Sequence, residues 1–160
     1  MEVVKKIILT GHFGVGKTSL VQKFVHQKFS EIYMTTIGVK IDKKVVDCEG
    51  IQVKLMIWDL AGESTARKVP TKYFGGAHGL FYVFDLTREE TYKNIDDDLF
   101  ELQKLLSNQP FIVLANKSDL VEDTFIENLS KELTVPFKIT SAKTGENVED
   151  AFLALAAQTL

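Results

Sequence analysis

Apolar residues recur along the chain in two distinct spacings, and these spacings predict its strands and helices. Short, continuous apolar runs such as residues 80–84 (LFYVF) are typical of strands covered on both faces of a sheet. On either side of Glu49-Gly50 the apolar residues instead occupy largely alternating positions, which predicts an antiparallel hairpin. The strands are expected near residues 3–10, 38–47, 50–58, 79–85, 111–116 and 137–140.

Helical spacing of apolar residues fills the intervals between these strands. Helices are expected near residues 17–27, 67–73, 89–107, 123–132 and 147–158. The last has one apolar face, which we expect to be ordinary hydrophobic core. The element order βαββαβαβαβα predicts an α/β fold, in which a six-stranded mixed sheet carries helices on both faces and binds its ligand across its carboxyl edge.

Composition narrows the function classes only slightly. A chain of 160 residues with 45% hydrophobic and 26% charged residues is typical of one soluble globular domain, here residues 1–160. The net charge of −3 gives no reason to expect nucleic acid or an anionic membrane as a partner. No stretch is long and apolar enough to span a membrane, and Lys5 and Lys6 interrupt any signal peptide. The single cysteine, Cys48, excludes an internal disulfide, suits a cytoplasmic protein and is expected to be a surface thiol at the hairpin turn.

Residues 11–18 (GHFGVGKT) fit the pattern G-x-x-x-x-G-K-[ST] where a predicted strand gives way to a predicted helix. In such a loop, glycines let consecutive backbone N–H groups curl around a polyphosphate, a lysine reaches the terminal phosphates and a hydroxyl binds Mg²⁺. A glycine-rich turn that fits by chance is the less favoured alternative, because the strand and the helix are both in place. The pattern predicts a P-loop NTPase three-layer sandwich whose phosphate-binding residues are Gly14, Val15, Gly16, Lys17, Thr18 and Ser19.

Residues 116–119 (NKSD) follow the apolar run 111–115, at the carboxyl end of a predicted strand. The Asp119 carboxylate can accept hydrogen bonds from both N1–H and the exocyclic amine of guanine, a pair of donors that adenine lacks. Alone, these residues would also fit a polar turn in which Asp119 caps the next helix. Roughly a hundred residues after a phosphate loop, they favour a guanine nucleotide.

Four further segments make the chain resemble the Ras-like small GTPases, most closely the Rab branch. They are residues 36–39 (TIGV), 58–62 (WDLAG), 73–79 (YFGGAHG) and 141–143 (SAK). The likeness runs from about residue 4 to residue 157. It implies a molecular switch that binds GTP or GDP with Mg²⁺ and hydrolyses GTP, with segments near residues 30–38 and 60–73 held ordered by the γ-phosphate and signalling to an effector.

The resemblance assigns roles around the phosphates. Mg²⁺ is expected to be held directly by Thr18 and, in the triphosphate state, by Thr36, with Asp59 acting through water. Thr18 as a helix cap and Thr36 as an ordinary loop residue are the alternatives. The expected catalytic residues are Lys17, Thr36, Gly62 and Glu63.

Around the base, the resemblance implies that Asn116 ties the loops together and that Lys117 lies along the guanine ring. The backbone amide of Ala142, in the segment that begins at Ser141, is expected to meet the guanine carbonyl. Lys143 is expected to support this loop rather than to contact phosphates.

Two positions stay open. Phe29 lies seven residues before Thr36, at the spacing where relatives place an aromatic ring against the base, but it fits equally well as a core phenylalanine at the end of the first helix. Thr35 competes with Thr36 for the metal, and the following Ile37-Gly38 favours Thr36 because it matches the register of the family.

Departures from the family concern catalysis. Relatives usually follow the Asp-x-x-Gly segment with a glutamine that orients the attacking water, whereas this chain has the atypical Glu63. An ionised carboxylate cannot donate a hydrogen bond and repels the triphosphate, although a general-base role is the alternative. Phe13 replaces a small residue and would obstruct an arginine finger from an activating protein. Arg67 is either a cation supplied in cis or a solvated residue.

These departures leave two hypotheses for the function, and the first of them also predicts the protein partners. A slow GTP-hydrolysing switch would use protein effectors and regulators that contact residues 30–39 and 60–76, including Ile37, Val39 and Trp58. A pseudo-GTPase, a nucleotide-bound interaction module with negligible hydrolysis, is the alternative. A nucleoside kinase would leave residues 116–119 and 141–143 unexplained. We expect no lipid anchor in this chain, because no prenylation motif ends it; a missing C-terminal tail is the alternative. A monomer is the default expectation.

Overall fold

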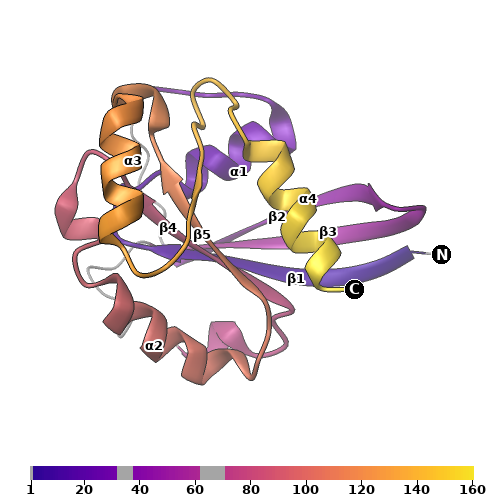
Figure 1. Cartoon of the computed structure of the whole chain (residues 1–160). Coiled ribbons are helices and arrows are strands. Elements are labelled where there is room, and N and C mark those ends of the chain that lie inside the picture. Colours follow the sequence, from indigo (N-terminus) through magenta and orange to yellow (C-terminus); the bar gives the residue numbers. More distant parts are fainter. Residues whose placement is uncertain (1, 32–37, 62–70) are drawn as a thin grey trace.

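The computed structural model describes residues 2–31, 38–61 and 71–160, and one twisted sheet of six strands runs through them (Figure 1). Its order is β2-β3-β1-β4-β5-β6, with only the β2–β3 pair antiparallel. The predicted six-stranded mixed sheet is therefore confirmed. The strands are β1 (Glu2–Gly11), β2 (Val39–Cys48), β3 (Ile51–Leu60), β4 (Gly79–Asp85), β5 (Phe111–Asn116) and β6 (Lys138–Ile139).

Helices cover both faces of this sheet and give it two hydrophobic cores (Figure 1). Helices α1 (Lys17–His26) and α4 (Val148–Gln158) pack on one face, and α2 (Ile95–Leu106) and α3 (Asp123–Glu132) on the other. The run in β4 shows why its sequence is continuously apolar, since Phe81 faces the first core and Tyr82 the second. Three short 3-10 helices complete the described elements: η2 (Thr71–Phe74), η3 (Glu89–Thr91) and η4 (Ser118–Leu120).

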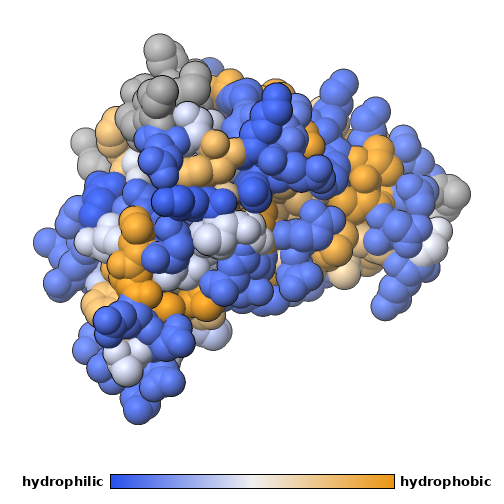
Figure 2. All heavy atoms as spheres, turned by 90° about the horizontal axis from the view of Figure 1, so that it is seen from above, coloured by the Kyte–Doolittle hydropathy of each residue, from blue (hydrophilic) through white to orange (hydrophobic). Residues whose placement is uncertain are grey.

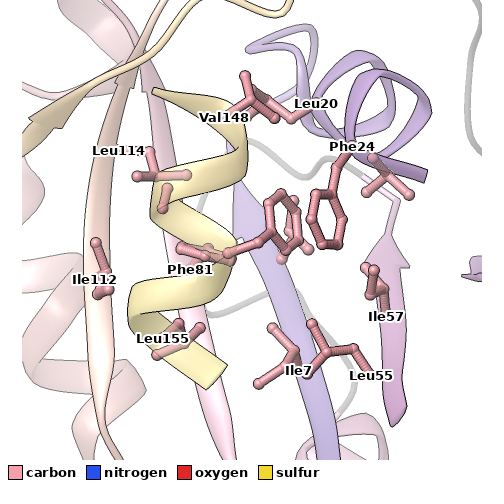
Figure 3. Close-up of a cluster of buried hydrophobic side chains, with 14 of the residues drawn as sticks. Ile7, Leu20, Phe24, Leu55, Ile57, Phe81, Ile112, Leu114, Val148 and Leu155 are labelled. Carbon is pink, nitrogen blue, oxygen red and sulfur yellow. The ribbon is translucent and has the colours of Figure 1, made fainter. Parts of the chain in front are cut away.

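Aromatic rings join the two helices of the first core to the sheet. The ring of Phe24 on α1 stacks on that of Phe152 on α4 with centroids 4.0 Å apart, and Phe81 of β4 meets Phe152 edge-on at 4.9 Å. Figure 3 shows Phe24 and Phe81 pointing into this cluster from α1 and the sheet. Because α1 is fixed here, the loop that precedes it is held at a constant position over the sheet edge.

The predicted helix over residues 89–107 is wrong in its first third. The structure has η3 over Glu89–Thr91, and α2 begins only at Ile95. Buried Thr91 donates to the carbonyl oxygen of Arg88 at 2.7 Å and accepts from the backbone N–H of Asp85 at 2.9 Å, so its hydroxyl ties the chain back to β4. Of the predicted helix over residues 67–73, residues 67–70 lie outside the described part, and η2 begins at Thr71.

Cys48 is not the surface thiol that the sequence predicted. It ends β2 on the face that packs against the first core and is only 7% exposed, because the hairpin turn consists of Glu49 and Gly50, both with positive φ. Burial raises the pKa of the thiol. A buried thiol with a raised pKa is poorly reactive, and Cys48 therefore packs as a small apolar side chain.

Polar side chains cover most of the face seen in Figure 2, and apolar groups appear between them in small patches. Within the described ranges, none of the helices has the length and apolar character needed to cross a membrane.

The aromatic stack makes Phe152 a test of how firmly α4 holds α1. We expect Phe152→Ala to lower the free energy of unfolding by about 3–5 kcal/mol, because it empties a ring-sized volume between Phe24 and Phe81. Phe100→Ala, on the exposed face of α2, is the matched control and should change it by less than about 0.5 kcal/mol. Urea unfolding followed by circular dichroism measures both, and equal effects would contradict the assignment of the core.

Candidate nucleotide-binding site

A cavity of about 420 Å³ opens at the carboxyl edge of the sheet, where β1, β3 and β5 end. It brings the loop between β1 and α1 next to residues 116–119, which are roughly a hundred residues away in sequence. Most of the predicted nucleotide-binding residues line it: Gly14, Gly16, Lys17, Thr18, Ser19, Phe29, Asn116, Lys117, Asp119, Ala142 and Lys143.

The remaining predicted residues fall into two groups. Val15 and Ser141 are completely buried and support the wall from behind rather than lining the cavity with their side chains. Thr36, Gly62 and Glu63, three of the four predicted catalytic residues, lie outside the described residues, as do Thr35, Ile37 and Arg67.

The loop before α1 follows a path that glycine tolerates best. Gly14 has φ +75° and Gly16 has φ +104°, and a β-carbon on Gly16 would collide with the side-chain amide of Asn116. Asn116 is itself buried and donates from Nδ2 to the Val15 carbonyl at 3.0 Å, while its Oδ1 accepts from Thr140 at 3.1 Å. The phosphate loop and the guanine motif are therefore joined directly, as the role predicted for Asn116 requires.

Lys17 begins α1 with its ammonium group inside the site. It donates to the carbonyl oxygens of Gly11 and His12 at 3.3 and 3.2 Å, and its side chain is 5% exposed. Burial lowers the pKa of Lys17 to about 8, and the nearby charge of Asp59 opposes this shift. A buried cation with long, weak hydrogen bonds is well placed to bind an anion that enters the cavity.

Thr18 and Asp59 form the part of the site suited to a hard cation. The hydroxyl of Thr18 donates to Oδ2 of Asp59 at 2.5 Å, and Asp59 is fully buried near the end of β3. Its Oδ1 is buried and has no hydrogen-bond partner among the described residues, and burial raises the pKa of this carboxyl. An orphaned carboxylate oxygen beside a hydroxyl fits Mg²⁺, which prefers oxygen ligands and keeps several waters. Thr18 would ligate the ion, and Asp59 would hold one of its waters.

The guanine motif is held by hydrogen bonds on both sides. Lys117, in a left-handed conformation, donates to the Gly14 carbonyl at 3.1 Å, and Ser141 donates to Oδ1 of Asp119 at 2.8 Å. Ser118, which lies between Lys117 and Asp119, is also held in place, because its hydroxyl donates to Glu146 at 2.9 Å. Asp119 therefore presents a carboxylate of fixed orientation to the cavity, which suits a ligand with two adjacent N–H donors.

At the mouth of the cavity, Phe29 is 37% exposed and lines it, so the alternative of a core phenylalanine is not supported. Lys143 pairs with Glu31 at 3.0 Å across this mouth, which raises the pKa of Lys143. The role predicted for Lys143, support of its own loop, stays a prediction. This exposed ion pair links the segment around Glu31 to the segment around Lys143, and both segments line the cavity.

Sequence reasoning missed Asp85 and Arg88. Asp85 is fully buried at the end of β4, and its Oδ2 lies 2.8 Å from Nζ of Lys117 without hydrogen-bond geometry, so the attraction is ionic. Arg88 donates to the Phe13 carbonyl at 2.8 Å. The signal for Asp85 was present in the sequence, because a carboxylate that ends an apolar strand in register with Asn116 must lie at the same edge of the sheet.

Comparison with known proteins agrees with this geometry. The chain matches the family model described as "Ras family" over residues 6–160, and it therefore belongs to the Ras family of small GTPases. It is similar to Ras-related protein RABD2a of Arabidopsis thaliana, with 39% identity over 158 residues that cover 95% of this chain and 78% of the relative. This likeness lies in the Rab branch.

Membership of this family defines the general activity. The chain is a guanine-nucleotide-binding molecular switch and a GTPase that binds GTP and GDP with Mg²⁺ and interacts with effectors and regulators. When bound, Mg²⁺ neutralises phosphate charge. The residues present fit the ion, with Thr18 and Asp59 on one side of the cavity and Lys17 beside them.

The orphaned oxygen of Asp59 predicts a specific loss on substitution. We expect Asp59→Asn to weaken Mg²⁺ binding to the GDP-bound protein about 10- to 100-fold, because an amide holds a metal-bound water less well than a carboxylate. Mg²⁺ titration followed by the rate of GDP release measures this. Asp47→Asn, at the turn of the same hairpin, is the control. Unchanged Mg²⁺ affinity in Asp59→Asn would show that Asp59 does not serve the metal.

Proposed function

We propose that this chain is a slow GTP-hydrolysing switch that uses the cavity at the carboxyl edge of its sheet. The observation that carries the proposal is that one cavity is lined by the phosphate loop at one end and by Asp119 and Lys117 at the other. Lys17 would bind the terminal phosphates, Thr18 and Thr36 the metal, and Phe29 one face of the base. Residues 1–160 would act as a single domain, since the six described strands share one sheet, and a monomer is the default expectation.

Catalysis would be slow for two reasons. Glu63 replaces the neutral amide that donates a hydrogen bond to the attacking water, and its charge repels the triphosphate. Phe13 is 48% exposed and lines the cavity, which places an aromatic ring where a partner's arginine would approach the phosphates. With Gly62 and Lys17 retained, the nucleotide would still be sensed and bound.

An effector surface would lie on the sheet beside the nucleotide. Trp58 and Tyr73 have ring centroids 6.3 Å apart, and Lys6 places its ammonium 3.8 Å above the Trp58 ring. Ile41 pairs with Trp58 in the hairpin and is 45% exposed. These side chains and half-buried Val39 form a largely apolar area. This area includes residues of the segments 30–39 and 60–76, which are the proposed contacts of effectors and regulators.

The rate of hydrolysis distinguishes a slow switch from a pseudo-GTPase. We expect Glu63→Gln to raise the single-turnover rate of Mg²⁺·GTP hydrolysis at least about tenfold, because the amide restores a donor and removes a repelling charge. Phe13→Gly should change the intrinsic rate little, since its proposed effect is on partner access. Glu101→Gln, remote on α2, is the control.

Two other results would change this interpretation. Fast wild-type hydrolysis that falls in Glu63→Gln would assign Glu63 a catalytic role, such as that of a general base. Bound GTP with no turnover above the protein-free rate, in the wild type and in Glu63→Gln, would favour the interaction module without hydrolysis.

The guanine assignment depends on Asp119. We expect Asp119→Asn to weaken GDP binding at least about tenfold and to strengthen binding of xanthosine diphosphate, because an amide N–H suits the 2-carbonyl of xanthine. Ser141 can still donate to the side-chain oxygen in this variant. Calorimetric titration with GDP and with xanthosine diphosphate measures both affinities, and Asp123→Asn is the control. An unchanged preference for GDP in Asp119→Asn would show that Asp119 does not contact the base.

A further inference from the structure

Every carbonyl oxygen of the phosphate loop, from Gly11 to Gly16, accepts a hydrogen bond from a donor that follows the loop in sequence. Lys17 binds those of Gly11 and His12, as described above. The donors for the next four carbonyls are Arg88 Nη1 for Phe13 at 2.8 Å, Lys117 Nζ for Gly14 at 3.1 Å, Asn116 Nδ2 for Val15 at 3.0 Å and Leu20 N for Gly16 at 2.9 Å. Arg88 is the one donor in this set that lies neither in the two nucleotide motifs nor in α1.

We propose that Arg88 is a positioning residue of the nucleotide site, which fixes the Phe13–Gly14 peptide so that its N–H group faces the phosphates. The inference rests on the proposed function, because it requires a nucleotide in this cavity. Arg88 itself touches the loop from outside, and it is not among the residues that line the cavity.

Peptide geometry connects the two sides of this bond. The Phe13–Gly14 peptide is trans and planar, so its N–H points opposite to its carbonyl oxygen. Holding the oxygen on Arg88 therefore turns the N–H of Gly14 away from Arg88, and Gly14 lines the cavity. Gly14 has φ +75° and little steric restraint of its own, so the orientation of this peptide depends on an external anchor.

The structure also holds Arg88 in place from its other sides. Its Nε donates to Glu90 at 3.0 Å, and its Nη1 lies 3.9 Å from Oδ2 of buried Asp85. The same Asp85 oxygen attracts Lys117, which binds the adjacent Gly14 carbonyl. The buried carboxylate of Asp85 thus orients two cations, Arg88 and Lys117, which bind two successive carbonyls of the loop. Because this carboxylate is buried, it restrains Arg88 more firmly than an exposed ion pair would.

The test is nucleotide affinity of the full chain after removal of bound nucleotide. We expect Arg88→Ala to weaken GDP binding about tenfold, the effect of losing one charge-assisted hydrogen bond at a partly exposed site. Binding of guanosine, which has no phosphates, should stay unchanged in an NMR titration. Arg88→Lys should recover part of the loss because it keeps a donor. The amide signal of Gly14 should shift on GDP addition in the wild type and less in Arg88→Ala.

Glu90→Gln is the matched control, because it removes the negative charge of the outer partner of Arg88 and leaves the bond to Phe13 in place. Equal loss of GDP and guanosine affinity in Arg88→Ala, or unchanged GDP affinity, would overturn the positioning role. A wild-type chain that binds no GDP would instead overturn the proposed function, and the two failures are therefore separable. If Arg88→Ala does not fold, unchanged GDP affinity and Gly14 shift in Arg88→Met would be the contradicting result.

Discussion

The hydrogen bonding of each peptide carbonyl in the phosphate loop is the constraint on which the site depends. A polyphosphate needs aligned N–H groups, and a carbonyl oxygen that faced it would repel it. In this chain the donors that bind these carbonyls come from α1, from the residue before η3 and from residues 116–117 at the end of β5. The shape of a six-residue loop is therefore set by the helix that follows it and by residues that follow β4 and end β5, which converge only in the folded sheet.

This arrangement leaves buried charges that the protein alone does not compensate well. Among the residues that the structure describes, Lys17 makes long hydrogen bonds to two carbonyls, and one carboxylate oxygen of Asp59 has no partner. Desolvation disfavours both charged forms, which is why the pKa of Lys17 falls and that of Asp59 rises. A phosphate beside Lys17 and a Mg²⁺ ion beside Asp59 would supply these partners, and nucleotide binding would then be thermodynamically linked to folding stability at these two residues.

Sequence predicted the parts of this fold and site that depend on local pattern. The strands, three helices and most of a fourth follow from apolar spacing, and the two nucleotide motifs follow from their residue types and their places at predicted strand ends. It missed Asp85 and Arg88, because neither belongs to a local motif and their roles arise from pairing with Lys117 and Phe13 across the sheet edge. The helix break at Thr91 was missed for a similar reason: its hydroxyl bonds to β4, and propensity along the chain does not record that contact.

The hairpin of β2 and β3 connects the metal site to both proposed switch segments. The backbone N–H of Ala61 donates to the Gly38 carbonyl at 2.8 Å, one step beyond the last pair of the ladder, Val39 and Leu60. Gly38 follows the segment that contains Thr36, and Ala61 precedes the segment that contains Glu63. Asp59 lies two residues before Ala61 on the same strand. Because this hydrogen bond joins the two strands next to both proposed switch segments, Asp59 and the two segments share one backbone connection.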